Sequence, residues 1–294
     1  MSSSIDRKTQ DELQDLLTSI NPSFQLEKFL GKGGQKIVYR IIDKTNGLPR
    51  IFKLIKPNDG DYIERVKREV LAANTIDHRN IPSVLYTNVH GVEGLDEPIW
   101  IIEECIPGKS LRQVLDEKYS FSIKEIIKFI DTMLSILEKA ESVHIVHRDI
   151  KPENIMFVDS GEFWLIDFGI SRHLDLDSIT ASEAPFGPCT IGYSAAEQFR
   201  NRKRDIDIRA DLFSMGVVVA EMITGINPYI KNTKGMLELI KRIENQPLPL
   251  LRIEGDKKFL LARYIRTVGD NRLLRRPRSI EEAKNIFTIV KDSL

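Results

Sequence analysis

The stretch from Ile145 to Gly169, IVHRDIKPENIMFVDSGEFWLIDFG, decides how the rest of the chain is interpreted. It contains two polar clusters, HRDIKPEN at 147–154 and DFG at 167–169, each with apolar residues beside it. The apolar runs at 155–157 and 163–166 predict two small strands that are joined by a turn at Asp-Ser-Gly.

Such a hairpin would place Asn154 and Asp167 at neighbouring strand ends, facing one cleft, with Asp149 on the loop just before it. Two carboxylates and a carboxamide suit a hard, oxygen-binding cation such as Mg²⁺, together with one base. The plain alternative is a set of solvated loop charges. The residues alternate in order with apolar strands, which favours the functional interpretation.

This stretch resembles the catalytic loop and DFG segment of the eukaryotic-like (Hanks-type) protein kinases. The resemblance implies that Asp149 accepts the proton of a substrate hydroxyl, while Lys151 neutralises the transferred phosphoryl group. It also implies that Asn154 and Asp167 hold Mg²⁺, with Mn²⁺ as an alternative. The position of Lys151, two residues after Asp149, resembles the pattern of Ser/Thr kinases rather than that of Tyr kinases. Glu153 is a candidate contact for basic residues of the substrate.

Composition fits a soluble globular protein, with 41% hydrophobic and 29% charged residues among 294. The formal net charge is zero, which disfavours nucleic acid as a partner. Only Cys105 and Cys189 are present, so a reducing cytoplasm is the expected location. Residues 1–10 show no signal peptide, and the apolar run at 212–220 is too short to span a membrane. The oligomeric state stays open.

The first part of the chain predicts one helix followed by strands. Leucines and an isoleucine at helical spacing predict a short helix at 8–20, so residues 1–23 form a helical extension. Residues 24–56 then read as strands that are separated by turns rich in glycine and asparagine. The resemblance covers about 24–290 and implies a kinase domain at 24–294, with a small lobe at 24–105 and a larger lobe at 106–294.

The first of these turns resembles the glycine-rich phosphate loop of the family. Its expected nucleotide-binding residues are Gly31, Lys32, Gly33, Gly34 and Val38. The family's third glycine is replaced by Lys36, which either adds charge near phosphate or points to solvent. Lys53 falls where the family has the lysine that holds the α- and β-phosphates, and Ile51 replaces the family's alanine against adenine.

The segment at 61–76 predicts a helix. The resemblance makes Glu69 the expected ion-pair partner of Lys53, with Glu64 as the fallback and a solvated helix face as the plain alternative.

The strand at 99–102 leads into a segment that resembles the hinge between kinase lobes. Backbone groups of Glu104 and Ile106 would bond adenine there, and Met156 is a further nucleotide contact that the resemblance implies. Glu103 stands where the family has an apolar side chain, and a buried carboxylate is costly unless it is paired. We therefore hypothesise that Glu103 competes with Glu69 for Lys53 or pairs with another donor.

The second lobe is predicted to be mainly helical, with a buried helix at 123–137. Residues 170–197 resemble an activation segment, on which Ser178 and Thr180 are candidate phosphorylation sites and Arg148 a candidate phosphate anchor. The resemblance also implies two structural contacts. In the first, Asp211 caps the catalytic loop, and in the second Arg276 pairs with Glu197.

The sequence thus predicts an α+β, two-lobed protein kinase fold, with a small antiparallel-sheet lobe that carries one main helix and a larger mainly α-helical lobe. The expected activity is ATP-dependent phosphorylation of protein Ser/Thr hydroxyls, with autophosphorylation of the activation segment. Alternatives are a pseudokinase scaffold that binds nucleotide weakly, a small-molecule phosphotransferase and a nucleic-acid-binding module. The nucleic-acid-binding alternative is supported only by the arginines at 263–278.

Overall fold

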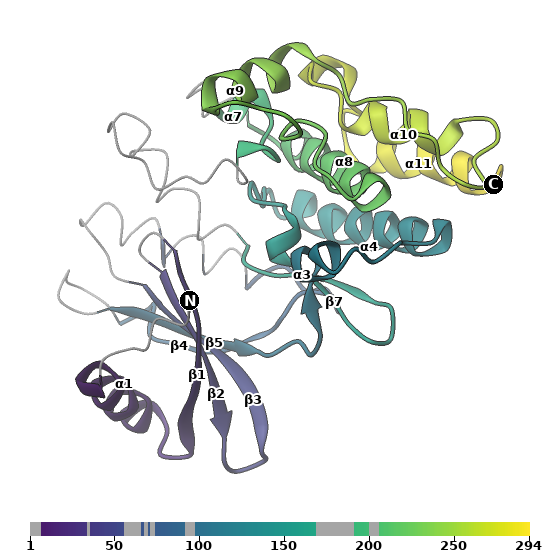
Figure 1. Ribbon diagram of the computed structural model, residues 1–294. Coiled ribbons are helices and arrows are strands. Elements are labelled where there is room, and N and C mark those ends of the chain that lie inside the picture. Colours follow the sequence, from purple (N-terminus) through teal and green to yellow (C-terminus); the bar gives the residue numbers. More distant parts are fainter. Residues whose placement is uncertain are drawn as a thin grey trace. The chain divides into compact units, whose positions relative to one another are not determined.

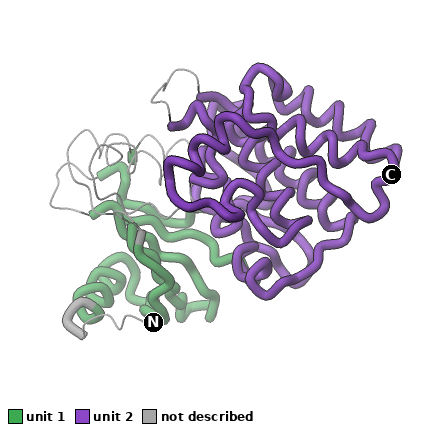
Figure 2. The backbone as a smooth tube through the Cα atoms, turned by 45° about the horizontal axis from the view of Figure 1, so that its top comes forward, with its two compact units in different colours: residues 1–74, 82–106 green, residues 75–81, 107–294 purple. Residues whose placement is uncertain are grey.

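The chain divides into two compact units (Figure 2). Unit 1 comprises residues 1–74 and 82–106, and unit 2 comprises residues 75–81 and 107–294. Within them, the computed structural model describes residues 7–33, 36–55, 66–67, 70, 74–91, 98–168, 191–199 and 206–294.

Unit 1 is built on a five-stranded antiparallel sheet with the strand order β1-β2-β3-β5-β4 (Figure 1). β-Branched and aromatic residues, which favour pleated strands, dominate these segments. The strands are β1 (Phe24–Gly33), β2 (Lys36–Asp43), β3 (Leu48–Ile55), β4 (Val84–Thr87) and β5 (Ile99–Glu104). The predicted strands are confirmed, and β4 is an additional one.

The two faces of this sheet have different roles, because neighbouring residues on a strand point to opposite sides. On one face, helix α1 (Arg7–Ile20) packs against the sheet and completes an apolar core. The buried members of that core are Leu13, Leu17, Phe24, Tyr39, Ile41, Phe52, Leu54 and Ile102. Lys53 lies between Phe52 and Leu54 on β3, and therefore belongs to the opposite face.

Helix α1 is joined to the sheet by hydrogen bonds as well as by apolar contacts. The side-chain amide of Gln14 donates to the carbonyl of Phe24 at 3.0 Å and accepts from the N–H of Leu26 at 2.8 Å. Gln14 thus satisfies backbone groups on β1 much as a neighbouring strand would. Helix α1 is therefore held on unit 1 both by its buried leucines and by Gln14.

Unit 2 is mainly helical, as the sequence predicts. α4 (Ile123–Ser142), α8 (Arg209–Thr224), α10 (Leu260–Val268) and α11 (Ile280–Lys291) pack on one another (Figure 1). The side chain of Ser122 caps α4, and residues 210–222 of α8 are all buried, as expected of a helix that is apolar all round.

Shorter elements complete unit 2. The helical ones are α3 (Leu111–Asp116), η1 (Pro152–Asn154), α7 (Ala196–Phe199), α9 (Met236–Asn245) and η3 (Leu273–Arg275). A three-stranded sheet consists of β6 (Lys109–Ser110), β7 (Ile155–Phe157) and β8 (Phe163–Leu165) in that order. No helix within the described ranges is long and apolar enough to cross a membrane.

The segment Thr75–Ile81 belongs to unit 2, although the sequence predicts one uninterrupted small lobe. The carbonyl of Asn80 accepts from the N–H of Leu165 at 3.0 Å, and the ring of His78 lies 3.0 Å from the hydroxyl of Ser135. These contacts tie the segment to β8 and α4. Of the predicted helix at 61–76, Val66, Lys67 and Val70 are described and are helical, whereas residues 74–76 are described and are not helical, so the predicted end of the helix is wrong.

Candidate active site

The β7–β8 hairpin of unit 2 confirms the interpretation of the opening stretch. The turn is closed by a hydrogen bond from the N–H of Gly161 to the carbonyl of Val158, and Gly161 takes the positive φ of 74° that this turn requires. The N–H of Ile166 donates to the carbonyl of Asn154 at 2.9 Å. Asn154 and the neighbour of Asp167 therefore lie at the same end of the hairpin.

The loop that carries Asp149 is fixed by a buried carboxylate. Both carboxylate oxygens of Asp211, which is fully buried, accept backbone hydrogen bonds, from His147 at 2.7 Å and from Arg148 at 2.8 Å. Arg148 itself has a positive φ of 66°, which few residues other than glycine adopt. The predicted capping role of Asp211 is confirmed, and these bonds hold the strained turn just before Asp149.

His147 joins this loop to the DFG segment, a role that the sequence analysis did not assign. Its Nδ1 accepts from the N–H of Asp149 at 3.2 Å, and its Nε2 lies 3.1 Å from the carbonyl of Ile166. These partners require a neutral ring with the proton on Nε2. Burial lowers the pKa of His147 to about 4, and the ring also makes an edge contact with Phe168 at a centroid distance of 4.6 Å.

The carboxylate of Asp149 is buried and held by two donors. Its Oδ2 accepts from the amide of Asn154 at 2.9 Å and lies 2.8 Å from the ammonium of Lys151. The same amide nitrogen bonds the carbonyl of Asp149 at 2.9 Å, which also fixes the side chain of Asn154. No donor among the described residues contacts Oδ1 of Asp149. The structure therefore brings together three residues that the sequence singled out and leaves one carboxylate oxygen open.

The oxygen donors of unit 2 fit a cation that is bound mainly by a nucleotide and water. Asn154 and Asp167 offer hard oxygen atoms, and Asp167 is half-buried with a positive φ of 63°. Within the described ranges no group of three or more His, Cys, Asp or Glu residues could hold a metal ion. Mg²⁺ commonly takes one or two protein side chains and completes its shell with phosphate and water, so this donor set suits it.

In unit 1, Lys53 and Glu103 form a buried ion pair. The ammonium of Lys53 lies 2.5 Å from Oε2 of Glu103, and the two residues are 3% and 8% exposed. Strand register explains the pairing, because Lys53 is opposite Ile101 and Ile51 is opposite Glu103, so all four share one face. The predicted pairing of Glu103 with Lys53 is thus confirmed. Its competition with Glu69 stays a prediction, because Glu69 and Glu64 lie outside the described residues.

The glycine-rich segment differs from the expected loop. β1 continues to Gly33 and β2 begins at Lys36, so Gly31, Lys32 and Val38 are strand residues rather than parts of a turn. Strong β formers on β2 extend the antiparallel ladder further than the glycines suggest. Val38 pairs with both Gly31 and Lys53, which places it on the face of the ion pair. Gly34 lies outside the described residues.

The expected hinge groups are found at the end of unit 1. The N–H of Glu104 is occupied by the carbonyl of Ser83 at 3.0 Å, so only its carbonyl can serve adenine. The N–H of Ile106 donates to no acceptor among the described residues. In unit 2, Met156 is half-buried on β7. Cys105, next to Ile106, is a free thiol.

A charged network around Arg112 on α3 was not foreseen. Its guanidinium bonds Glu153 at 2.9 Å, Glu221 at 3.0 Å and the hydroxyl of Tyr193 at 2.5 Å, and that hydroxyl donates to Glu221. Burial raises the pKa of Tyr193, so the hydroxyl keeps its proton. Glu153 is therefore already paired within the chain, and its contact with basic substrate residues stays a prediction.

The end of the activation segment is anchored as predicted. Arg276 forms a two-pronged ion pair with Glu197, with nitrogen–oxygen distances of 2.6 and 3.2 Å, and both residues are buried. The candidate phosphorylation sites Ser178 and Thr180 lie outside the described residues, as does Gly169.

Comparison with known proteins agrees with this geometry. The family model described as "Protein kinase domain" matches residues 24–264. A probable serine/threonine-protein kinase of Clostridium acetobutylicum is 28% identical over 276 residues, which cover 92% of this chain and 40% of the relative. The serine/threonine-protein kinase PrkC of Bacillus subtilis is 28% identical over 214 residues, or 71% and 32% of the two chains.

A probable serine/threonine-protein kinase PknB of Bifidobacterium longum is 30% identical over 213 residues, which cover 70% of this chain and 31% of the relative. The chain thus spans two fifths or less of the length of these curated relatives. Nothing in the described residues favours the scaffold alternative, since Lys53, Asp149, Asn154 and Asp167 are all in place. The family model covers most of the chain, and the chain belongs to the protein kinase domain family.

Proposed function

We propose that this domain transfers the γ-phosphoryl group of ATP to serine or threonine hydroxyls of proteins. The observation that carries the proposal is the Asp149 carboxylate of unit 2. It is held by Asn154 and Lys151 on Oδ2, and Oδ1 has no donor among the described residues. A carboxylate that is fixed on one oxygen and open on the other suits a general base for a hydroxyl.

The proposed step balances without a covalent intermediate on the protein. The substrate oxygen forms a bond to the γ-phosphorus while the bond to the bridging β–γ oxygen breaks and ADP departs. Asp149 Oδ1 takes the hydroxyl proton. Lys151, which already lies 2.8 Å from the other oxygen of Asp149, is near enough to neutralise charge on the transferred group.

Asn154 and Asp167 are the residues that we propose would hold Mg²⁺, with Mn²⁺ as the alternative. The cation would supply charge neutralisation for the phosphates. The chain's own contribution is orientation, since the amide nitrogen of Asn154 is committed to Asp149 and its oxygen is thereby aimed elsewhere. The backbone bond between Ile166 and Asn154 keeps Asp167 at the same hairpin end.

Unit 1 would contribute the nucleotide contacts. Lys53 is the proposed ligand of the α- and β-phosphates, because it is a cation on the sheet face that also carries Val38 and Ile51. The carbonyl of Glu104 and the N–H of Ile106 are the proposed partners of adenine. Among the described residues, no neighbouring atom lies within 4 Å of where a Cβ of Gly31 would stand, which leaves room there for a phosphate to approach the backbone.

The proposed substrates are proteins, and the proposed location is the cytoplasm, where ATP is available. Autophosphorylation of the activation segment, at Ser178 or Thr180, stays a prediction.

The test is transfer of label from γ-labelled ATP, with Mg²⁺, to a generic protein rich in serine and threonine. The wild type should phosphorylate it, and Asp149→Ala should lower the rate by roughly a thousandfold or more because the base is lost. Asp159→Ala, in the exposed hairpin turn of the same unit, is the matched control and should leave the rate unchanged. Label transfer by Asp149→Ala at the wild-type rate would refute the assignment.

A further inference from the structure

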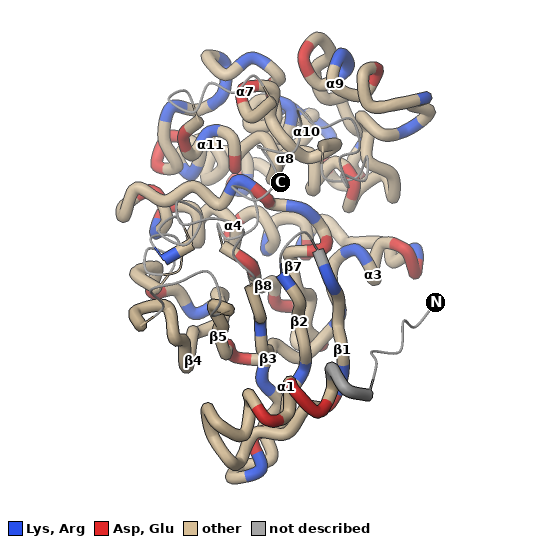
Figure 3. Tube along the Cα trace, turned by 90° about the vertical axis from the view of Figure 1, so that its left-hand side faces the viewer, with Lys and Arg blue, Asp and Glu red and all other residues tan. Residues whose placement is uncertain are grey.

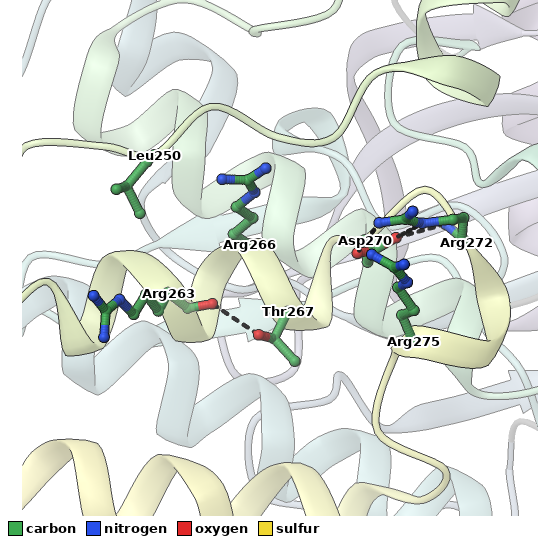
Figure 4. Close-up of a pocket in the computed structure, with 7 residues that line it drawn as sticks. All are labelled: Leu250, Arg263, Arg266, Thr267, Asp270, Arg272 and Arg275. Carbon is green, nitrogen blue, oxygen red and sulfur yellow. Dashed lines mark hydrogen bonds and ion pairs between the residues drawn. The ribbon is translucent and has the colours of Figure 1, made fainter.

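A basic pocket lies in unit 2 between α10, η3 and the chain near Leu250 (Figure 4). It is an open surface pocket with a volume of about 570 Å³. Its lining residues are Leu250, Arg263, Arg266, Thr267, Asp270, Arg272 and Arg275. The lining of the pocket thus includes four arginines, all of them exposed, and a single acidic residue.

The charges of this pocket are unbalanced. Four arginines and one aspartate leave a formal charge of +3. Asp270 pairs with Arg272, at 3.2 Å. Arg263, Arg266 and Arg275 have no carboxylate within ion-pair distance among the described residues. Another exposed cation of unit 2, Lys109, does have one, because it pairs with Glu117 at 2.7 Å.

Two plain explanations account for only part of the cluster. Arg266 is in the last turn of α10, where a cation is stabilised by the partial negative charge of the helix end. That effect does not extend to Arg275, which lies on η3. A general excess of basic residues is also ruled out, because the net charge is zero and Figure 3 shows acidic and basic residues interspersed along the chain.

The arrangement of the guanidinium groups indicates the shape of the ligand. Figure 4 shows Arg272 and Arg275 at the Asp270 end of the pocket, Arg266 on α10, and Arg263 at the opposite end, toward Leu250. A single phosphoryl group would meet only one end of such a row. An extended chain with several anionic groups would meet all of it, and Leu250, which is 47% exposed, adds an apolar contact.

We propose that this pocket docks an extended, aspartate- and glutamate-rich segment of a partner protein. Guanidinium groups bind carboxylates through paired hydrogen bonds, which matches the lining. No aromatic side chain lines the pocket to stack on bases, so a protein segment is favoured over single-stranded nucleic acid. The docking does not depend on phosphoryl transfer; where the partner is also a substrate, docking would raise its local concentration.

The experiment measures binding of a fluorescent peptide of alternating glutamate and alanine by anisotropy, using the full chain. The same peptide with glutamine in place of glutamate is the uncharged control. Wild type should bind the glutamate peptide and not the glutamine peptide. The double variant Arg263→Glu with Arg266→Glu should lose at least about tenfold in affinity, because two cations become anions.

The matched control is Lys257→Glu with Lys258→Glu, an equal charge change at exposed positions that do not line the pocket. It should keep its affinity within about twofold. Thermal unfolding of each variant checks that the fold is retained, and transfer to the generic protein should be equal in all of them. That equality separates failure of the docking proposal from failure of the kinase assignment.

Three results would overturn the proposal. They are the absence of glutamate-peptide binding, an equal loss in the lysine control, and tighter binding of a competitor. The competitors are a peptide whose only charged group is one phosphoserine and a single-stranded oligonucleotide of the same length.

Discussion

The two units hold their buried carboxylates in different ways. In unit 2, Asp211 receives two backbone donors and Glu197 receives two nitrogens of Arg276. In unit 1, Lys53 is the sole donor among the described residues that reaches the carboxylate of Glu103. All three acidic residues are less than a tenth exposed, so the contrast lies in the number of donors and not in burial.

The difference separates a fixed framework from an exchangeable contact. Burying a carboxylate costs free energy, and two good donors offset that cost only when both are correctly placed. Such a carboxylate therefore stabilises a single local geometry. A carboxylate whose only donor is one ammonium group can lose that contact when another anion competes for the ammonium group. We therefore regard the catalytic loop as preformed and the Lys53–Glu103 pair as a contact that phosphate has to displace or share.

The largest expected effect is on the framework of unit 2. Arg276→Met should lower the free energy of unfolding by about 3–5 kcal/mol, because it leaves Glu197 buried without its partner. Urea unfolding measures this. Arg278→Met, at an exposed neighbouring position, should change it by less than about 0.5 kcal/mol. Equal effects of the two variants would contradict the framework role.

The second largest effect is expected at Asp211, which caps the catalytic loop. Asp211→Asn replaces one acceptor oxygen with a donor, so one backbone N–H of the loop loses its partner inside the core. We expect a loss of about 2–3 kcal/mol in unfolding free energy and a large loss of transfer rate. The control is Asp131→Asn, which breaks only the exposed pair with Lys291 and should cost less than about 1 kcal/mol.

The free energy of unfolding is expected to depend on pH through His147. The pKa of His147 is about 4 in the fold, below its ordinary value of 6.5, so the unfolded chain binds the proton more tightly. Stability is therefore full above pH 6.5 and falls as the pH drops toward 4, by at most about 3 kcal/mol. His147→Gln should flatten the pH profile of unfolding free energy. His144→Gln, at an exposed histidine, should keep the wild-type slope.

The smallest effect is expected at the helix that covers the sheet of unit 1. Gln14→Ala removes the two hydrogen bonds to Phe24 and Leu26 but leaves the buried leucines of α1 in place. The expected cost is about 1–2 kcal/mol in thermal or urea unfolding. Gln10→Ala, on an exposed part of the same helix, should be neutral. A neutral Gln14→Ala would show that apolar packing alone holds the helix.

Local pattern predicted much of the fold and the floor of the site. The hairpin around Gly161 followed from alternating apolar runs and a turn, and family resemblance supplied the Asp211 cap and the Glu197–Arg276 pair. Family resemblance also pointed to Glu103 as a position in need of a partner, because the family has an apolar side chain there and a buried carboxylate is costly unless it is paired.

Other features escaped prediction because no local pattern encodes them. The Arg112 network joins residues far apart in the chain, and no local sequence pattern links them. β4 is only four residues long with mixed exposure, too short for a clear alternation. The glycine-rich turn was predicted too long, because the cross-strand pairing of β1 and β2 outweighs the weak strand preference of Gly31 and Gly33.

The affinity of ATP for wild type and Glu103→Gln tests the contrast between the units most directly. Glutamine keeps the size of the side chain but removes the charge that competes with phosphate for Lys53. Titration calorimetry with Mg²⁺ and ATP should show binding that is roughly three- to tenfold tighter in Glu103→Gln than in wild type. Equal or weaker binding would contradict the account, because it would mean that Glu103 positions Lys53 for the nucleotide instead of restraining it.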